Sequence, residues 1–479
     1  MIEVSKNIYT YLVNLYGEEK SAHYLDYIKQ EPAQYIRVNS LKTNPNDLSE
    51  LLFNNYRIET KTIDNLPNSL LVQSGNELIG KTVEHITGLY YIQSLSSLLP
   101  PYVLKPSPGE RVLDLCAAPG SKSTQLAELM RNTGTLIVNE IQLSRVKTLV
   151  YNLDRMNIIN AGVLNFKGEI LSKIYDNYFD KVLVDVPCSG LGIIQKKEEV
   201  SNWWSTKRVK ALSELQLKLL IAAIKMTKPG GNIVYSTCTL TPEENELVIN
   251  SVLKKYPVIL DSFDLPVTNQ QGLTKYDDEL LSNDLSLTKR MIPWEVNSDG
   301  FFLARLIKKE ETPPMEKLSS LRAKDVLITD YKNKKINSHL LRLFNYYGID
   351  EALLERFRFQ LKNNDIYFHN ANWSDDNPGI YERIGTRFGL IDRNGEIILN
   401  TQAAQVLAEY FRENVYYITE GIELNRYLEG GIFKNKSTIK GQCVVSFNNN
   451  VLGSAVVTES GVKSRFPRAK RTQDIHKEF

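Results

Sequence analysis

The sequence has few cysteines and no long apolar run. Its 479 residues include four cysteines, Cys116, Cys188, Cys238 and Cys443. No two of them form a CxxC pair, which argues against a zinc ribbon or a disulfide framework and favours a reducing compartment. No stretch reaches the ~18 apolar residues of a membrane span, and the start MIEVSKNIYTYL lacks the basic and apolar parts of a signal peptide. We therefore expect a cytoplasmic protein with no membrane partner.

A large net charge is also absent. The 58 lysines and arginines nearly balance the 56 aspartates and glutamates, so the molecule as a whole is not a polycation. Any surface that binds nucleic acid must then be local. The chain is long enough, and with 42% hydrophobic residues apolar enough, for two or three domains that each have a core.

The order of apolar and amphipathic stretches predicts an α/β fold. Across residues 109–228, the apolar runs RVLDLCA, TLIVNE and KVLVDVPC alternate with the helical stretches STQLAELM and LSRVKTLVYNLDRM. A further helix, about residues 207–226, precedes GNIVYSTCTL, and the next helix is expected to open at Thr241, Pro242 and Glu243. Continuous apolar strands separated by helices indicate a mostly parallel, doubly wound sheet covered on both faces.

Composition shifts divide the chain into four parts. Residues 1–105 alternate helical patterns with short strands and form an expected α+β module, and residues 106–310 hold the parallel sheet, closed by the expected edge strand GFFLARLIKK. The polar, proline-bearing KKEETPPMEK marks the main boundary. We expect a linker and a small helical region over residues 311–374, and a second β-rich domain over residues 375–479.

The stretch LCAAPGSK links a strand to a helix, the place where doubly wound sheets bind ligands. Its spacing is not GxGxxG, so a dinucleotide pyrophosphate is not the expected ligand. Glu140 stands twenty residues after Gly120, at the end of TLIVNE, where a carboxylate can accept hydrogen bonds from both ribose hydroxyls. The alternative interpretation is a tight turn and an ordinary surface glutamate.

Two of the cysteines directly follow apolar strands. Cys188 lies in DVPCSG and Cys238 in YSTCTL, and two parallel strands would bring both to one edge of the sheet. A buried cysteine is usually a small apolar residue, and we keep that interpretation for Cys116 and Cys443. Cys188 and Cys238 instead meet polar or small residues, where a thiol can reach substrate. The sequence therefore predicts a pocket that holds two thiols.

Seven elements in order resemble the Nop/Sun family of RNA cytosine-carbon-5 methyltransferases, which use S-adenosylmethionine. They are RVNSLK, GLYYIQSLSS, DLCAAPGSKSTQLA, NEIQLSRVKTLVYNLDRMN, DVPCSGLG, KPGGNIVYSTCTLTPEENE and GFFLARL. More weakly, ELNRYLEGG and VLGSAVVTESGVKSRFPRAKR resemble the PUA-like domain of the bacterial branch that modifies small-subunit ribosomal RNA. The resemblance implies a Rossmann-like class I methyltransferase core between an N-terminal RNA-binding module and a C-terminal PUA-like RNA-binding domain.

The chemistry of cytosine explains the thiols. Carbon 5 is a poor nucleophile, so a thiolate must first add to carbon 6. The resemblance assigns this attack to Cys238 and gives Cys188 a part in releasing the methylated base. It also implies that Asp185 hydrogen-bonds the edge of the cytosine ring and that Lys122 supplies positive charge. The residues alone leave the two thiols unranked, because DNA cytosine methyltransferases attack with the cysteine of a proline-cysteine element.

The resemblance also implies the cofactor site, which contains no metal. The residues implied to hold S-adenosylmethionine are Cys116, Ala117, Ala118, Pro119, Gly120, Ser121, Lys122, Glu140 and Asp185. One position departs from the family, because Lys167 stands where the bacterial branch has an aspartate that meets the adenine amine. A lysine cannot accept that hydrogen bond, so Glu169 or the backbone must replace it.

The expected partner is RNA, either ribosomal RNA or the small ribosomal subunit, bound by a monomer. Its contacts are expected from YIRVNSLK and from a basic tail around Phe466, formed by Lys463, Arg465, Arg468, Lys470 and Arg471. Three alternatives stay open: a tRNA cytosine-5 methyltransferase, a catalytically silent ribosome-assembly factor, and an amino-group methyltransferase. The intact thiols argue against the second, and DVPCSG argues against the third, which needs no thiol.

Overall fold

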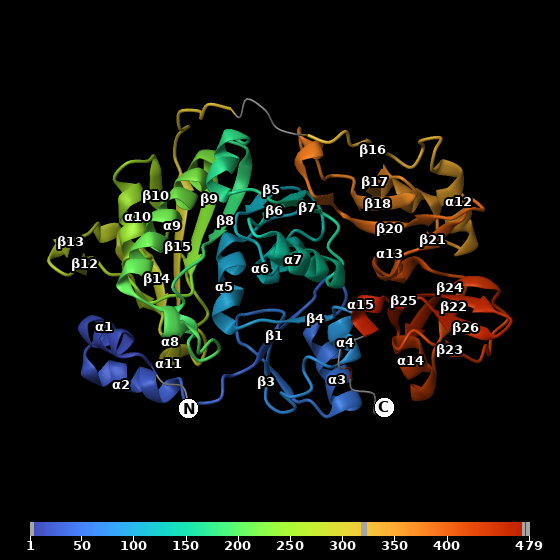
Figure 1. Cartoon of the computed structure of the whole chain (residues 1–479), viewed down its shortest axis with the longest axis horizontal. Coiled ribbons are helices and arrows are strands. Elements are labelled where there is room, and N and C mark those ends of the chain that lie inside the picture. Colours follow the sequence, from blue (N-terminus) through green and yellow to red (C-terminus); the bar gives the residue numbers. More distant parts are fainter. Residues whose placement is uncertain (1–3, 318–322, 472–474, 476–479) are drawn as a thin grey trace.

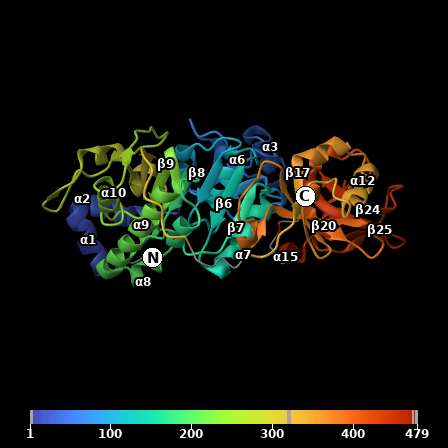
Figure 2. The same cartoon turned by 90° about the horizontal axis from the view of Figure 1, so that it is seen from above.

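The computed structural model describes residues 4–317, 323–471 and 475. In Figure 1 the large central sheet occupies the left and middle, the smaller N-terminal sheet lies below it, and the two C-terminal sheets lie one above the other at the right. Figure 2 shows the same parts from above, with the N-terminal helices at one end and the C-terminal sheets at the other. Among the described residues, no helix combines the length and apolarity of a membrane span.

A four-stranded antiparallel sheet forms most of the N-terminal part, in the order β2-β3-β1-β4. Its α3 begins where the Asn44 side chain accepts a hydrogen bond from the Asp47 amide and proline occupies the first turn. Leu48 and Leu52 of α3 pack on Ile36 of the sheet. The bounds are β1 Tyr35–Val38, α3 Pro45–Tyr56, β2 Thr60–Thr62, β3 Ser69–Val72, α4 Val83–Ile86 and β4 Tyr90–Ile92.

The first two helices, α1 (Lys6–Tyr16) and α2 (Glu18–Tyr27), pack elsewhere. Their apolar side chains share a core with Leu191 and Trp204, which follow strands of the central sheet. The Tyr24 hydroxyl donates to the Leu191 carbonyl oxygen at 2.5 Å. The N-terminal part of the chain, from residue 4 to 105, therefore contains a helix pair and a small sheet that lie below different ends of the central sheet in Figure 1.

The central sheet has ten strands in the order β11-β14-β15-β9-β8-β5-β6-β7-β19, with β10 also paired to β15. Its middle, from β9 to β7, is parallel, and β15 runs antiparallel to β9. The bounds are β5 Arg111–Asp114, β6 Thr135–Asn139, β7 Ala161–Leu164, β8 Phe179–Asp185, β9 Thr227–Thr237, β10 Val258–Leu260, β11 Gln270–Gln271, β14 Lys289–Met291, β15 Phe301–Lys308 and β19 Arg383–Ile384.

Helices cover both faces of this sheet. Val112 and Leu113, adjacent in β5, point into opposite cores because side chains alternate along a strand. The Val112 core contains α5 (Leu95–Leu104), α6 (Ser121–Leu129) and α7 (Leu143–Arg155), and the Leu113 core contains α9 (Thr206–Met226) and α10 (Glu246–Leu253). This arrangement confirms the predicted doubly wound core. The strand order reverses between β5 and β8, and ligands bind at such a point in open α/β sheets.

One prediction about the sheet edges is wrong, and the other edge holds a strand that was not predicted. The strand expected to close the sheet, β15, lies inside it, because residues 258–291 fold back as β10 and β14 beside it. At the other side, β19 pairs with β7, so the chain beyond the methyltransferase segment contributes the last strand. The local sequence does not indicate β14 or β19, because these strands have only three and two residues.

The C-terminal part holds two five-stranded sheets, ordered β16-β17-β18-β20-β21 and β22-β24-β25-β26-β23. The bounds are β16 Ile328–Thr329, α12 Asn337–Tyr346, β17 Phe357–Lys362, β18 Asp365–Asn370, β20 Thr386–Ile391, β21 Ile397–Leu399, α13 Thr401–Val406, β22 Val415–Tyr417, α14 Gly421–Leu428, β23 Ile432–Phe433, β24 Gly441–Phe447, β25 Asn450–Thr458, β26 Gly461–Ser464 and α15 Arg468–Arg471. The expectation of a small helical region over residues 311–374 is thus incomplete: β16, β17 and β18 join α12 there. β18 pairs with β20 across residue 374, so one sheet spans that expected boundary.

Candidate active site

The two predicted thiols meet at the edge where β8 and β9 end. Asp185 pairs with Ser236 in the parallel register, so the segments that follow start side by side. The Sγ atoms of Cys188 and Cys238 lie 2.8 Å apart, and the Cys238 amide donates to the Cys188 sulfur at 3.3 Å. This separation exceeds the ~2.05 Å of a disulfide bond, and both thiols are free. The two thiols therefore come together at one edge of the sheet, as the sequence predicts.

Lys122 and Asp185 form an ion pair at the same edge. The Lys122 Nζ lies 2.8 Å from the Asp185 Oδ2, while the Ser236 hydroxyl donates to the Asp185 Oδ1 at 2.7 Å. Burial alone would lower the pKa of Lys122, but the Asp185 carboxylate raises it, helped by the charge of Cys238. Lys122 is thus a fixed cation within electrostatic range of Cys238.

The two thiols have different surroundings. The hydrogen bond with Cys238 raises the pKa of Cys188 well above its usual value, and burial and the carboxylate of Glu244 raise it further. Lys122, by contrast, interacts with Cys238. This asymmetry holds Cys188 as a neutral thiol that can donate to the Cys238 sulfur.

Glu244 ties the two thiol segments together, and sequence reasoning did not find it. Its Oε1 accepts from the Ser189 amide and the Gln216 side chain, both at 2.8 Å, and its Oε2 accepts from the Thr241 hydroxyl at 2.8 Å. Gln216 also donates to the Pro187 carbonyl oxygen at 2.9 Å. The carboxylate thereby fixes the residues on both sides of Cys188.

The helix expected to open at Thr241 begins later. α10 starts at Glu246, and Thr241 to Asn245 form a turn instead. In that turn, the Asn245 side chain accepts from the Thr237 hydroxyl at 2.6 Å and donates to the Thr239 carbonyl oxygen at 3.1 Å. The polar run TPEENE that resembled a helix start therefore braces the segment of Cys238, and this run was the available signal for Glu244.

The turn after β5 approaches the C-terminal end of β6. Gly120 has a φ of 109°, and a Cβ at this position would lie 3.1 Å from the Leu149 side chain. Glu140 directly follows β6 with its carboxylate almost fully buried, and it pairs with Arg145 at 3.2 Å. Arg145 also donates to the Ala118 carbonyl oxygen at 2.5 Å. The predicted cofactor residues thus gather around one strand edge.

Burial also governs the remaining two cysteines. It raises the pKa of Cys116 well above its usual value, helped by nearby carboxylates, and that of Cys443 to about 12. Both are therefore neutral thiols at ordinary pH, as the small-apolar-residue interpretation predicts.

Asp114, at the end of β5, is a second residue that sequence reasoning missed. Burial raises its pKa to about 7, although the Ser123 hydroxyl donates to its Oδ2 at 2.6 Å. Its Oδ1 is buried without a hydrogen-bond partner among the described residues. An acid that ends an apolar strand just before LCAAPGSK was the available signal.

Lys167, the departure from the family pattern, is exposed after β7. Nearby, the Asn165 side chain donates to the backbone oxygens of Glu140 and Ile141 at 2.7 and 2.9 Å. Ile141 is an apolar residue with 54% of its surface exposed beside Glu140. An apolar surface that a planar adenine can cover therefore adjoins the predicted ribose-binding carboxylate.

Several basic residues expected to face RNA are instead buried. Arg37 is 2% exposed and pairs with Glu128 at 3.0 Å. In the C-terminal tail, Phe466 is 1% exposed inside a core, and the Lys470 Nζ donates to the Ile86 carbonyl oxygen at 2.9 Å. These three side chains are therefore not available to RNA, because tertiary contacts enclose them. Lys463 and Arg468 are exposed, and their contact with RNA stays a prediction.

The sequence is similar to those of known RNA methyltransferases. The family model described as 16S rRNA methyltransferase RsmB/F matches residues 101–307. A tRNA (cytosine(49)-C(5))-methyltransferase of Pyrococcus abyssi is 35% identical over 311 residues, 64% of this chain and 98% of that protein. A ribosomal RNA small subunit methyltransferase F of Pectobacterium carotovorum is 29% identical over 413 residues, 83% of this chain and 81% of that protein. Several eukaryotic rRNA (cytosine-C(5))-methyltransferases are matched over only 35% to 50% of their length.

A solved structure agrees with the sequence matches. A methyltransferase homolog protein from Pyrococcus horikoshii superposes with a TM-score of 0.56 at 30% identity, covering 64% of this chain and all of that one. The similarity supports a class I methyltransferase core. Together with the extent of the archaeal sequence match, it shows that the chain belongs to the Nop/Sun family of RNA cytosine-carbon-5 methyltransferases.

Proposed function

We propose that the protein transfers a methyl group from S-adenosylmethionine to carbon 5 of cytosine in small-subunit ribosomal RNA. The observation that carries this proposal is the pair of thiols 2.8 Å apart at the strand edge that also holds the Lys122–Asp185 ion pair. Methylation of a nitrogen needs no such thiols, whereas cytosine carbon 5 requires a nucleophile to activate it.

The residues at this edge fit S-adenosylmethionine. The turn at Gly120 brings backbone close to the site, Glu140 offers a buried carboxylate to ribose hydroxyls, and Ile141 offers an apolar face to adenine. The other proposed contacts are Cys116, Ala117, Ala118, Pro119, Ser121, Lys122 and Asp185. When bound, the cofactor supplies an electrophilic methyl group on a sulfonium. The buried Asp114 has an unpartnered Oδ1 near this turn, which is consistent with a polar ligand there.

Cys238 acts as the nucleophile in the proposed mechanism. Its thiolate adds to carbon 6 of the cytosine, which moves electron density to carbon 5 for the attack on the methyl group. Lys122, paired with Asp185, supplies a positive charge within electrostatic range of Cys238. The Asp185 carboxylate accepts a hydrogen bond from the protonated edge of the cytosine ring and so stabilises the adduct.

Cys188 acts in the release of the product. After the carbon 5 proton leaves, the bond between carbon 6 and the Cys238 sulfur breaks, and its electron pair returns to that sulfur. Cys188 is a neutral thiol directly beside this sulfur, so its S–H can stabilise the departing thiolate. The neighbouring charges thus provide a basis for ranking two thiols that the sequence left unranked.

The ribosomal substrate rests on the extent of the match to the small-subunit methyltransferase, which reaches into the C-terminal sheets. We infer that residues 1–105 and a PUA-like domain within 375–479 contact this RNA. In the second C-terminal sheet, the rings of Tyr416 and Phe433 from opposite edge strands lie 5.5 Å apart, so the sheet curves toward closure as a small barrel does. A cytoplasmic monomer is the proposed working form.

A tRNA cytosine-5 methyltransferase is the second candidate. The match to the archaeal tRNA enzyme covers 98% of that protein but only 64% of this chain. Bisulfite sequencing of total RNA from cells with and without the gene separates the two substrates. A lost 5-methylcytosine in small-subunit ribosomal RNA supports the proposal, and one in tRNA supports the second candidate.

The mechanism is tested with two matched thiol variants. With labelled S-adenosylmethionine and ribosomal RNA, Cys188→Ala should accumulate a covalent protein–RNA adduct that is visible on a denaturing gel. Cys238→Ala should give neither adduct nor methylated RNA. Normal turnover by Cys238→Ala would refute the assigned nucleophile, and absence of methylation by the native protein on every RNA would refute the proposed function.

A further inference from the structure

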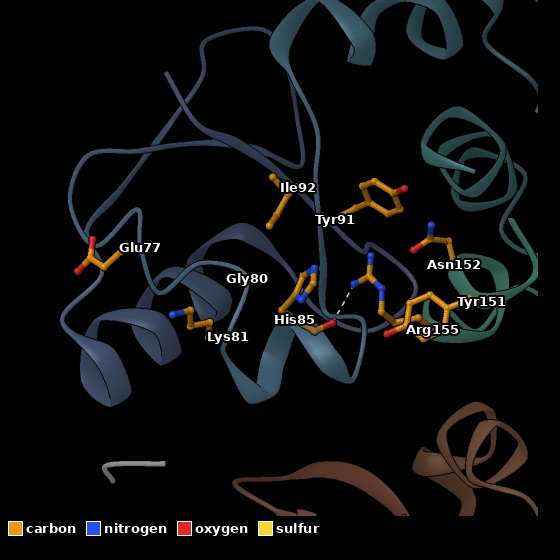
Figure 3. A pocket seen from close by; sticks show the side chains of 9 residues that line it. All are labelled: Glu77, Gly80, Lys81, His85, Tyr91, Ile92, Tyr151, Asn152 and Arg155. Atoms are coloured by element: carbon orange, nitrogen blue, oxygen red, sulfur yellow. Dashed lines mark hydrogen bonds between the residues drawn. The ribbon is translucent and has the colours of Figure 1, made fainter. Parts of the chain in front are cut away.

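A cavity of about 540 Å³ lies outside the thiol site. It opens between the N-terminal sheet and α7, as Figure 3 shows, and its walls include Lys81, His85, Tyr91, Ile92, Asn152 and Arg155. The carboxylate Glu77 also lines it but forms no ion pair with Arg155. None of the four proposed catalytic side chains lines it. The cavity is nevertheless adjacent to the cofactor turn, because the Asn152 side chain donates to the Pro119 carbonyl oxygen at 2.9 Å.

Arg155 brings an unneutralised charge to this cavity. Its side chain lies between the ring of His85 and Tyr91 in Figure 3, and the residue is 2% exposed. One terminal nitrogen donates to the carbonyl oxygens of His85 and Tyr90 at 2.8 and 2.9 Å, while Nε has no partner among the described residues. The buried Arg37 pairs with Glu128, whereas Arg155 forms no ion pair within the described chain. Buried charges are normally paired, so an anion is missing here.

Two lysines lie beside the same segment, residues 85–87. The Nζ atoms of Lys42 and Lys470 donate to the carbonyl oxygens of Thr87 and Ile86, at 2.5 and 2.9 Å. Burial and the neighbouring cations lower the pKa of Lys42 well below its usual value and that of Lys470 to about 8. Burial, with the charge of Arg155, also lowers the pKa of His85 to about 3, so Arg155 and Lys470 carry the positive charge of this segment at neutral pH.

We propose that this cavity binds a phosphate group of the RNA substrate, several nucleotides away from the methylated cytosine. This inference rests on the proposed function and adds a contact to it. Arg155 supplies the positive charge that a phosphodiester requires, and Lys81 also lines the cavity. Ile92, 38% exposed in the same lining, offers an apolar surface to the adjoining sugar and base. The class of ligand follows from the buried guanidinium without an ion pair and the apolar side chain in the same lining.

The cavity is linked to the catalytic lysine through one aromatic ring. The guanidinium groups of Arg155 and Arg37 lie 5.0 and 5.3 Å from the centre of the Tyr91 ring. Arg37 in turn donates to the carbonyl oxygen of Ser121 at 2.7 Å, next to Lys122 in α6. A phosphate bound at Arg155 is therefore held in a fixed position relative to the cofactor turn.

The test places a negative charge at the rim without disturbing the buried groups. Ile92→Asp should weaken binding of a fluorescent stem-loop RNA with cytosines in its loop by about tenfold at low salt. It should also lower the slope of log Kd against log salt by about 0.7 to 1, the loss of one phosphate contact. Lys81→Gln should shift both quantities in the same direction.

Ile259→Asp is the matched control, because Ile259 is a 46%-exposed isoleucine in β10, on the central sheet. It should leave RNA affinity unchanged, and all three variants should bind S-adenosylmethionine like the native protein. Native RNA affinity and salt slope in Ile92→Asp would overturn the phosphate site. This outcome is distinct from failure of the proposed function, in which the native protein binds RNA but methylates none.

Discussion

Replacing Glu244 by glutamine should make Cys188 more acidic while the two thiol segments stay in place. A glutamine oxygen can still accept from the Ser189 amide, and the Thr241 hydroxyl can turn to accept from the new NH₂ group. Only the negative charge is removed. Because that charge is among the causes that raise the pKa of Cys188, after the Cys238 hydrogen bond and burial, the pKa should fall.

The size of this effect follows from the position of the charge. Glu244 is fully buried and binds the amide of the residue next to Cys188 at 2.8 Å, so little water screens the interaction. A like charge at close range in a protein is worth on the order of 1–2 kcal/mol. Since about 1.4 kcal/mol is a factor of ten, the thiolate fraction of Cys188 at fixed pH should rise about tenfold.

The assay is the rate of Cys188 alkylation by iodoacetamide as a function of pH. A Cys238→Ser background in both arms removes the neighbouring thiol, and peptide mass spectrometry separates Cys188 from the buried Cys116 and Cys443. Glu243→Gln is the matched control, because Glu243 accepts from Tyr11 and Tyr276 instead of contacting the thiol segments. If the pH profile of Cys188 is the same with glutamate or glutamine at 244, the electrostatic ranking of the thiols is refuted.

Three further substitutions test the site. The folded protein favours the neutral form of Asp114, whose pKa is about 7 there. Its contribution to the free energy of unfolding, up to about 4 kcal/mol, is therefore fully present below pH ~4 and is lost as the pH rises through 7. Asp114→Asn should remove this pH dependence of unfolding in urea. Lys122→Met should reduce methyl transfer at least about 100-fold with an unchanged circular dichroism spectrum. Gly192→Ala should lower stability by about 1–3 kcal/mol in thermal melts, because its Cβ would lie 2.4 Å from the Gly300 carbonyl oxygen. The control Gly80→Ala, with only a 3.8 Å contact, should melt within about 0.5 kcal/mol of the native protein.

The strand-end rule made the thiol pair predictable. In a parallel sheet, neighbouring strands expose their carboxyl ends at one edge, so Cys188 and Cys238 had to emerge together once both strands were recognised. The alternation of apolar runs with amphipathic stretches predicted the doubly wound core. It could not predict β14 or β19, because strands of three and two residues carry no hydrophobic period and their pairing depends on the sheet already being formed.

Charged residues were predicted less well, because sequence does not show which cations acquire a buried partner. Arg37 lies in a motif that favoured RNA contact, yet its carboxylate partner Glu128 is 91 residues away in the chain. Lys470 looked like part of a solvated basic tail, but it caps a carbonyl oxygen of residue Ile86 in the N-terminal module. A local charge pattern therefore identifies a candidate RNA surface only where the basic side chain forms no hydrogen bond or ion pair with a group distant in the sequence.

Glu244 is a further case in which hydrogen bonds to residues distant in the sequence decide the local structure, here beside the two thiols. Read locally, TPEENE is a good opening for a helix, since proline and acidic residues favour a first turn. A turn forms instead, because the Glu244 carboxylate accepts hydrogen bonds from Ser189 and Gln216 on two other elements. The helix α10 therefore begins only at Glu246. The delay leaves one carboxylate beside Cys188, while Lys122 lies on the side of Cys238. Two chemically identical thiols thereby acquire opposite electrostatic neighbours, and the proposed division of roles between Cys238 and Cys188 rests on this difference.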